Sequence, residues 1–178
     1  MAVPILKSPN LTMRGASEDD AKLRFALGQE NPEILRMYGV SPDSVGRLTL
    51  ERAKNWANSL VEHPYAWVIE SSVLLGSVRL DKVDLHDRRA SLAIGLFDQG
   101  QLGKGYGTEA AREVLRYGFE QLHLHRVSLR VLTYNERAIR SYQKCGFRIE
   151  GRERETAFLD GVWHDDLIMG VLEHEFVP

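Results

Sequence analysis

The chain has 178 residues, a formal net charge of −2, and 43% hydrophobic and 27% charged side chains. These values fit one globular domain over residues 1–178, large enough for a hydrophobic core, and argue against a disordered or membrane-embedded protein. The slightly acidic balance also argues against bulk binding of nucleic acid, which normally needs a basic excess.

The cysteine content and the N-terminal segment favour a cytoplasmic protein. Cys145 has no second cysteine with which to form an intrachain disulfide, as is usual in a reducing compartment. It precedes Gly146 at an expected helix end, which favours a small packing residue over a nucleophile. Residues 1–9 lack the basic lead and apolar core of a secretion signal, and no apolar run approaches the roughly 20 residues that span a bilayer.

The N-terminal third is predicted to hold one strand and three helices. Residues 11–16 alternate weakly between apolar and polar, as a first strand does. Ser17 then caps a helix over residues 21–27. A second helix over residues 32–37 has proline at its first position, and residues 48–60 form a third, rich in Ala, Glu and Lys.

Three strands follow, because the hydrophobic period changes there from helical to alternating. We place them at residues 65–70, 73–80 and 90–97. The first two follow each other consecutively, and the third is the strand before the glycine-rich segment.

Three alternating glycines separate the last of these strands from the next helix. Gly103, Gly105 and Gly107 lie just before a helix that we expect to begin near Thr108. Glycines permit positive φ and leave N–H groups uncovered, and the first turn of a helix adds unpaired N–H groups and partial positive charge. The pattern predicts a cradle for a phosphate or pyrophosphate, although glycines also serve as plain turn residues.

The last third of the chain alternates helices and strands and then closes with a hairpin. After the amphipathic helix from Thr108 we expect a strand, a helix and two hairpin strands, over residues 126–132, 136–144, 147–158 and 162–171. Asn135 is a favourable cap for the late helix, and Asp160-Gly161 is a typical hairpin turn. This order of elements predicts an α/β fold with a mixed sheet and helices on both faces.

Asn135 and Tyr142 of the late helix are candidates for a functional site. They are seven residues apart, so both lie on nearly the same face, roughly 10 Å apart along the axis. In one interpretation Asn135 is only a cap and Tyr142 only a core residue. In the other, an amide and a phenol stand beside whatever the glycine loop binds.

Several separated motifs resemble the GNAT superfamily of acyl-CoA-dependent N-acyltransferases. They are the glycine loop, the following strand, Asn135 and the run from Ala138 to Phe147. Glu150-Gly151 is also usual in these proteins, and residues 152–158 and 160–165 resemble the branch that acetylates ribosomal-protein amino termini and assorted small amines. The resemblance is close over residues 65–172, and before that it follows the general layout only.

The resemblance implies a mostly antiparallel sheet that is splayed in its middle, with acetyl-CoA as co-substrate and no metal. The strand before the loop would pair with the pantetheine arm, the loop amides would hold the pyrophosphate, and Asn135 would hydrogen-bond the cofactor. It thus assigns cofactor binding to Ile94, Leu96, Phe97, Leu102, Gly103, Lys104, Gly105, Tyr106, Gly107, Thr108 and Asn135. The family's loop begins with Gln or Arg, whereas this chain has Leu102 at that position and Gln101 one place early.

Tyr142 is the expected general acid. Attack of an amine on a thioester expels a thiolate whose conjugate acid has a pKa near 8.5, against about 10 for tyrosine, so a positioned phenol can donate its proton at little cost. The general base is left open. Some relatives keep a glutamate twelve positions before this tyrosine, where this chain has Arg130. Other candidates for a base or water relay are Ser91, Asp81, Asp84 and His86, each more typical of a surface or turn.

The resulting hypothesis is an N-acetyltransferase that moves an acetyl group to a primary amine by direct attack. The acceptor is a protein N-terminus or a small amine, with no nucleic acid or membrane partner and a possible homodimer. Lys104, Arg137 and Arg140 could contact the cofactor phosphates. A kinase is disfavoured because the loop lacks the Gly-Lys-Ser/Thr ending of a P-loop, and a dehydrogenase because its glycine motif would follow the first strand. The alternative is an inactive acyl-CoA-binding or regulatory domain.

Overall fold

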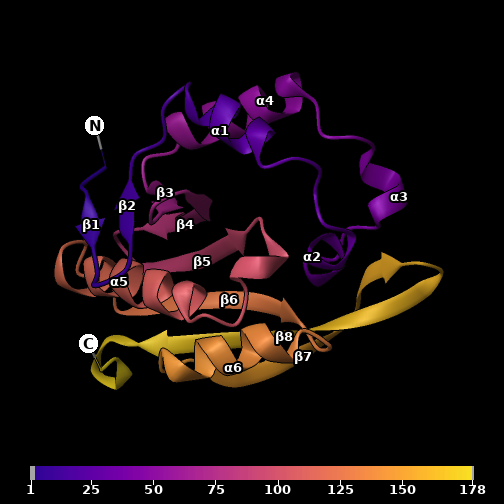
Figure 1. Ribbon diagram of the computed structural model, residues 1–178. Helices are drawn as coiled ribbons and strands as arrows, with labels where there is room; N and C mark the ends of the chain where they lie inside the picture. The colour runs from indigo at the N-terminus through magenta and orange to yellow at the C-terminus, as the bar shows by residue number, and fades with distance from the viewer. Residues whose placement is uncertain (1–2, 178) are drawn as a thin grey trace.

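The computed structural model describes residues 3–177, which form an eight-stranded sheet with helices on both faces (Figure 1). The strand order is β1-β2-β3-β4-β5-β6-β8-β7. The strands are β1 Leu6–Lys7, β2 Thr12–Arg14, β3 Ala66–Glu70, β4 Leu74–Asp84, β5 Arg89–Leu96, β6 Arg126–Leu132, β7 Arg148–Leu159 and β8 Val162–Leu172. Among these, β5 and β6 pair in parallel and the other neighbours are antiparallel. The expected mixed and mostly antiparallel sheet is confirmed.

The helices form two layers on opposite faces of the sheet. They are α1 Asp20–Ala26, α2 Pro32–Met37, α3 Pro42–Val45, α4 Leu50–Val61, α5 Tyr106–Glu120 and α6 Glu136–Lys144, with 3-10 turns η1 Gln99–Gln101 and η2 Glu173–Glu175. In Figure 1, α5 and α6 lie side by side on one face, and α1 and α4 lie together beyond β3 and β4. Among the described residues, no helix has the length and apolar character needed to cross a membrane.

The main core lies between the sheet and α5. This helix buries a stripe of small and branched residues at helical spacing, from Ala110 through Val114 to Gly118. They pack against fully buried strand residues such as Trp67 and Leu80. A smaller cluster under α4 contains Leu60 and its neighbours. The amphipathic pattern of α5 therefore fixes the helix that carries the glycine loop against the middle of the sheet.

Local boundary residues account for the elements that the sequence places well. The bounds of α2, β6 and α6 match the expected ranges, and the Asp160-Gly161 turn has positive φ at both residues, 50° and 82°. α5 begins at Tyr106, two residues before the expected start, because Gly105 at φ 89° already serves as its cap. The two-residue β1 and the single turn α3 were not predicted, since neither is long enough to show a hydrophobic period.

The sheet opens between β5 and β6, as the resemblance implied. Their pairing covers Arg89 to Ser91 against Arg126 to Ser128 and extends no further. The amide of Phe97 donates to the Leu75 carbonyl on β4 (2.9 Å). Because alternate residues of a strand direct their backbone groups to opposite sides, Ile94 and Leu96 direct theirs toward the gap beside β6. The open gap thus presents backbone groups that no strand pairs.

Candidate active site

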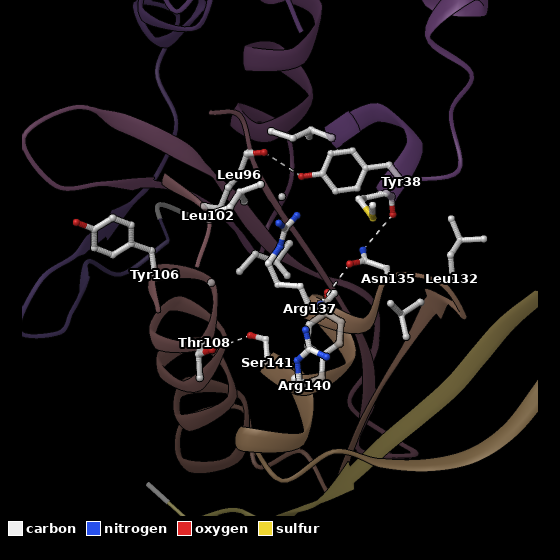
Figure 2. A pocket seen from close by; sticks show the side chains of 18 of the residues that line it. Tyr38, Leu96, Leu102, Tyr106, Thr108, Leu132, Asn135, Arg137, Arg140 and Ser141 are labelled. Carbon is white, nitrogen blue, oxygen red and sulfur yellow. Dashed lines mark hydrogen bonds between the residues drawn. The ribbon is translucent and has the colours of Figure 1, made fainter. Parts of the chain in front are cut away.

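A cleft of about 510 Å³ lies at the gap between β5 and β6. Its walls come from the ends of both strands, from the loop between η1 and α5, from α6 and from α2 (Figure 2). The Thr108 and Ser141 hydroxyls, 2.7 Å apart, connect the start of α5 to α6 along this wall. The cleft therefore joins elements that are far apart in sequence.

The glycine loop presents a row of free backbone amides to the cleft. Gly103 and Gly105 have φ of 77° and 89°, and α5 then begins without a side-chain cap. The first helical bond is donated by Glu109 to the Gly105 carbonyl, 2.9 Å away. Among the described residues, the N–H groups of residues 103–108 donate to no protein acceptor. Free amides at a helix start are the chemistry that binds phosphate.

The space in front of these amides is open, and cations surround it. A Cβ added to Gly103, Gly105 or Gly107 would meet no atom within 4 Å. Arg137, Arg140 and Lys144 line the same cleft, and the first two were among the cations predicted to contact phosphates. Arg140 pairs with Glu136 (3.0 Å), whereas Arg137 has no carboxylate within ion-pair distance in the described chain. The residues present therefore fit a bound polyanion such as the phosphates of CoA.

Tyr142 lines the cleft from α6, and no hydrogen bond to its hydroxyl is found within residues 3–177. Its ring packs against Phe147 at 5.8 Å between centroids. Burial raises the pKa of Tyr142 above its ordinary value of 10.0, and the nearby Tyr38 and Cys145 raise it further. The phenol therefore holds its proton at neutral pH. It is also a weaker acid than a solvated tyrosine.

Asn135 serves as the cap of α6, as one of the two interpretations proposed. Its Oδ1 accepts from the Ala138 amide (3.2 Å), and its Nδ2 donates to the Met37 carbonyl at the end of α2 (3.3 Å) (Figure 2). The residue is 8% exposed and lines the cleft. With one Nδ2 hydrogen left over, its contact with a cofactor stays a prediction.

The structure brings most of the predicted cofactor residues to the cleft, but not Phe97 and Lys104. Phe97 lies on the other side of β5, edge-on to Trp56 and 4.2 Å under the Arg24 guanidinium. The Phe97 ring thus contacts residues of α1 and α4 and does not line the cleft. Lys104 donates to the Gln101 side chain (2.9 Å) at the exposed end of the loop.

None of the four candidate bases lines the cleft. Asp81 pairs with His63 (3.1 Å) and with Arg79 (2.8 Å). Asp84 accepts from the amides of His86 and Asp87 and so holds a turn together. The interpretation of Asp84 and His86 as turn residues is confirmed.

Tyr38 at the end of α2 is a cleft residue that sequence reasoning missed. Its hydroxyl donates to the Leu96 carbonyl (3.1 Å), one of the groups directed into the gap (Figure 2). Burial raises its pKa to about 12, so it stays protonated. A Cβ on Gly95 would lie 2.7 Å from this hydroxyl. The one available signal was the glycine itself, since glycine inside a strand often marks a close approach.

Asp166 on β8 is a second cleft residue that sequence reasoning missed. The Arg130 guanidinium contacts its Oδ2 at 3.0 Å and the Glu153 carboxylate at 2.7 Å. The pairing of β6, β8 and β7 brings these charges together, and no local sequence motif indicates this proximity.

Comparisons with known proteins agree with this geometry. The model of a family described as an acetyltransferase (GNAT) domain matches residues 10–148. The probable N-acetyltransferase YjcK of Bacillus subtilis is 26% identical over 94% of this chain and 97% of that protein. Spermidine N(1)-acetyltransferase of Escherichia coli is 34% identical over 57% of this chain and 54% of the enzyme. The crystal structure of spermidine N-acetyltransferase from Vibrio cholerae with CoA and spermine matches with a TM-score of 0.78 at 25% identity, covering 94% and 98%.

Proposed function

Because this chain belongs to the GNAT family of acetyl-CoA-dependent N-acetyltransferases, we propose that it acetylates a primary amine by direct attack, with Tyr142 as the acid. The observation that carries the proposal is the row of unpaired amides at residues 103–108, which faces open space in the cleft that Tyr142 also lines. The acceptor is the amino terminus of a peptide or a small amine.

The cleft residues divide the cofactor between them. In the proposal, the amides of residues 103–108 hold the pyrophosphate, and Arg137, which has no ion-pair partner in the described chain, contacts a phosphate. Ile94 and Leu96 use the backbone groups that face the gap to bind the pantetheine arm as an added strand. Phe97 takes no part, since its amide already bonds Leu75.

Acetyl-CoA supplies the acetyl group as a thioester. Tyr142 donates its phenolic proton to the departing sulfur. Burial in the cleft makes the phenol a weaker acid, and burial in the same cleft also makes the sulfur a stronger base. Backbone N–H groups in the gap can polarise the thioester carbonyl.

Cys145 is unsuited to forming an acyl-enzyme. Its thiol is buried, bonds the Thr108 carbonyl (3.5 Å), and burial raises its pKa to about 11. A thiol in that state holds its proton and is a poor nucleophile at neutral pH. The acetyl group therefore passes directly from sulfur to nitrogen.

The alternative, an inactive acyl-CoA-binding domain, is favoured by one observation. Arg130 occupies the position at which some relatives keep a glutamate as general base, and none of the predicted bases lines the cleft. Such a domain would be stabilised thermally by acetyl-CoA and would release no thiol with any amine.

A thiol-release assay with acetyl-CoA over N-terminal peptides and small amines tests the proposal. We expect release with at least one acceptor class. Tyr142→Phe is then expected to lower kcat by about 100-fold, within the usual range for a general acid, with CoA affinity within about twofold. Full turnover in Tyr142→Phe, measured under conditions where chemistry limits the rate, would remove the acid role. Absence of release across the panel would support the inactive domain.

A further inference from the structure

The cleft is reached from both faces of the sheet, and Asp166 enters it from the face opposite α6. On β6, Leu129 and Val131 belong to the core beneath α6, so Arg130 and Leu132 between and after them face the other side. Asp166 lies directly across the β6–β8 ladder from Leu132, and opposed residues project from the same face.

In the proposed function, this face of the gap is left to the acceptor. The glycine loop, Arg137 and Tyr142 place the cofactor on the α5 and α6 side of the gap. The attacking nitrogen and the departing sulfur bond to the same carbonyl carbon, so the acceptor needs a path that the cofactor does not fill. Asp166 lines the end of that path.

Asp166 is the one carboxylate among the described residues that line the cleft. Its side chain is 15% exposed, and Arg130 contacts its Oδ2 at 3.0 Å. Its other oxygen, Oδ1, has no protein partner within residues 3–177. Arg130 also contacts the Glu153 carboxylate at 2.7 Å, but of the two carboxylates only Asp166 borders the cleft. A fixed carboxylate with one free oxygen is suited to an ammonium group.

We propose that Asp166 binds the ammonium group of the acceptor and takes its first proton, an inference that rests on the proposed function. The nitrogen–carbon bond then forms as the carbon–sulfur bond breaks. Of the two protons that the nitrogen loses, the first passes to Asp166 and on to solvent. The sulfur takes the phenolic proton of Tyr142. The second proton of the nitrogen then passes to the Tyr142 oxygen and restores the phenol. Arg130 acts as a positioning residue that orients the carboxylate.

The same site predicts the class of acceptor. One carboxylate, already shared with Arg130, can offset a single ammonium group, whereas every further charge of a polyamine would be left without a partner. Ile34, Met37 and Leu132 give the neighbouring wall an apolar character. The acceptor is therefore a monocationic amine with an apolar neighbouring group, such as a peptide amino terminus with an apolar first side chain. This differs from the spermidine enzymes to which the chain is similar.

Two substitutions separate this role from simple ion pairing. Asp166→Asn and Glu153→Gln each remove one of the two carboxylates that Arg130 holds, but only the first changes the cleft. We expect Asp166→Asn to lower kcat/KM for the amine by about 10- to 100-fold, as loss of a charged hydrogen bond implies, with CoA affinity within about twofold. Glu153→Gln should stay within about twofold of the wild type. The readouts are steady-state kinetics, calorimetric titration with CoA and melting temperatures.

The acceptor arm uses leucine-first tripeptide amides, phenethylamine and spermidine. An apolar monoamine is expected to have the highest kcat/KM. Equal effects of Asp166→Asn and Glu153→Gln, or spermidine as the best acceptor, would overturn the inference while the wild type still releases thiol. No release from the wild type with any amine would instead contradict the proposed function itself. If Asp166→Asn does not fold, Asp166→Glu is the second test. It is expected to fold, to bind CoA and to have a lower kcat/KM for the amine. Full activity in Asp166→Glu would overturn the role.

Discussion

The Tyr38 side chain fills the space in the cleft that a side chain at position 95 would need. A Cβ on Gly95 would lie 2.7 Å from the Tyr38 hydroxyl oxygen and 3.1 Å from the ring carbon that carries it. The hydroxyl can therefore reach the Leu96 carbonyl only because residue 95 has no side chain. This contact places a protonated phenol at the gap, on the strand that we propose to bind pantetheine.

The shared space makes substitutions at the two positions non-additive. Gly95→Ala should displace the Tyr38 ring and break its bond to Leu96, so its cost in kcat/KM should be smaller in a Tyr38→Phe background. We expect Tyr38→Phe alone to cost about 3- to 10-fold, the value of one neutral hydrogen bond, and the coupling free energy to reach about 1 kcal/mol. Steady-state kinetics of the four proteins measure the coupling.

Tyr134→Phe is the matched control for this cycle. Tyr134 also donates its hydroxyl to a carbonyl, that of Arg36, but it does not line the cleft. It should show no coupling with Gly95→Ala. Costs of Gly95→Ala and Tyr38→Phe that simply add would show that the two residues act independently.

At the scale of elements, the start of α5 is both a helix end and the proposed anion site. Gly107 lies in its first turn without positive φ, and a side chain there would meet open space. Gly107→Val should therefore leave stability unchanged, since glycine is a poor helix residue. The new side chain would stand in front of the amides and is expected to weaken CoA binding at least about tenfold, or about 1.4 kcal/mol.

Calorimetric titration with CoA and a melting curve test this prediction. Gly151→Val is the control, because Gly151 also faces open space without positive φ but lies on β7, away from the cleft. CoA affinity that is equal in the two variants would place the phosphates elsewhere.

The elements that the sequence predicts best are those whose boundary chemistry is local. Asn31 caps α2 ahead of Pro32, and Asn135 caps α6, so both helices have the expected bounds. The glycine loop and Tyr142 were found for the same reason, since each belongs to a continuous motif. Tyr38 and Asp166 were missed because their partners lie 58 and 36 residues away, at Leu96 and Arg130. Such proximity is set by strand pairing and helix docking, which no local pattern encodes.

At the scale of the whole molecule, α2 connects the two parts of the open sheet. Tyr38, which follows α2, bonds the Leu96 carbonyl at the end of β5. From the other part, Tyr134 and Asn135 donate to the last carbonyls of α2, those of Arg36 and Met37. Of these three carbonyls, only that of Leu96 belongs to a strand at the gap, and the other two belong to the end of the helix. The short helix and the residue that follows it are therefore hydrogen-bonded to both parts of the open sheet.

An ion pair with a buried carboxylate joins α1, which packs beside α4, to the sheet. Asp20 on α1 is 0% exposed and accepts from Arg14 on β2 (2.8 Å), which also contacts Glu70 on β3. Burial alone would raise the pKa of Asp20, but hydrogen bonds from Arg14 and Ser17 outweigh it and hold the pKa below its ordinary value. A carboxylate with a depressed pKa contributes stability at pH values above its ordinary pKa. This contribution is lost as the pH falls through the folded-state pKa.

Asp20→Asn is therefore expected to lower the free energy of unfolding by about 2 kcal/mol at pH 7, because it removes the charged hydrogen bonds between Asp20 and Arg14 while Arg14 keeps its contact with Glu70. The difference from the wild type should shrink as the pH falls below about 4, where protonated aspartic acid resembles asparagine. Urea unfolding at pH 7 and pH 3 measures both values. Asp19→Asn removes an exposed pair with Lys22, whose side chains are 83% and 78% exposed, and should change stability little at either pH. A loss in Asp20→Asn that is equally large at pH 3 would mean that the side chain acts through packing, and that the charge does not join α1 to the sheet.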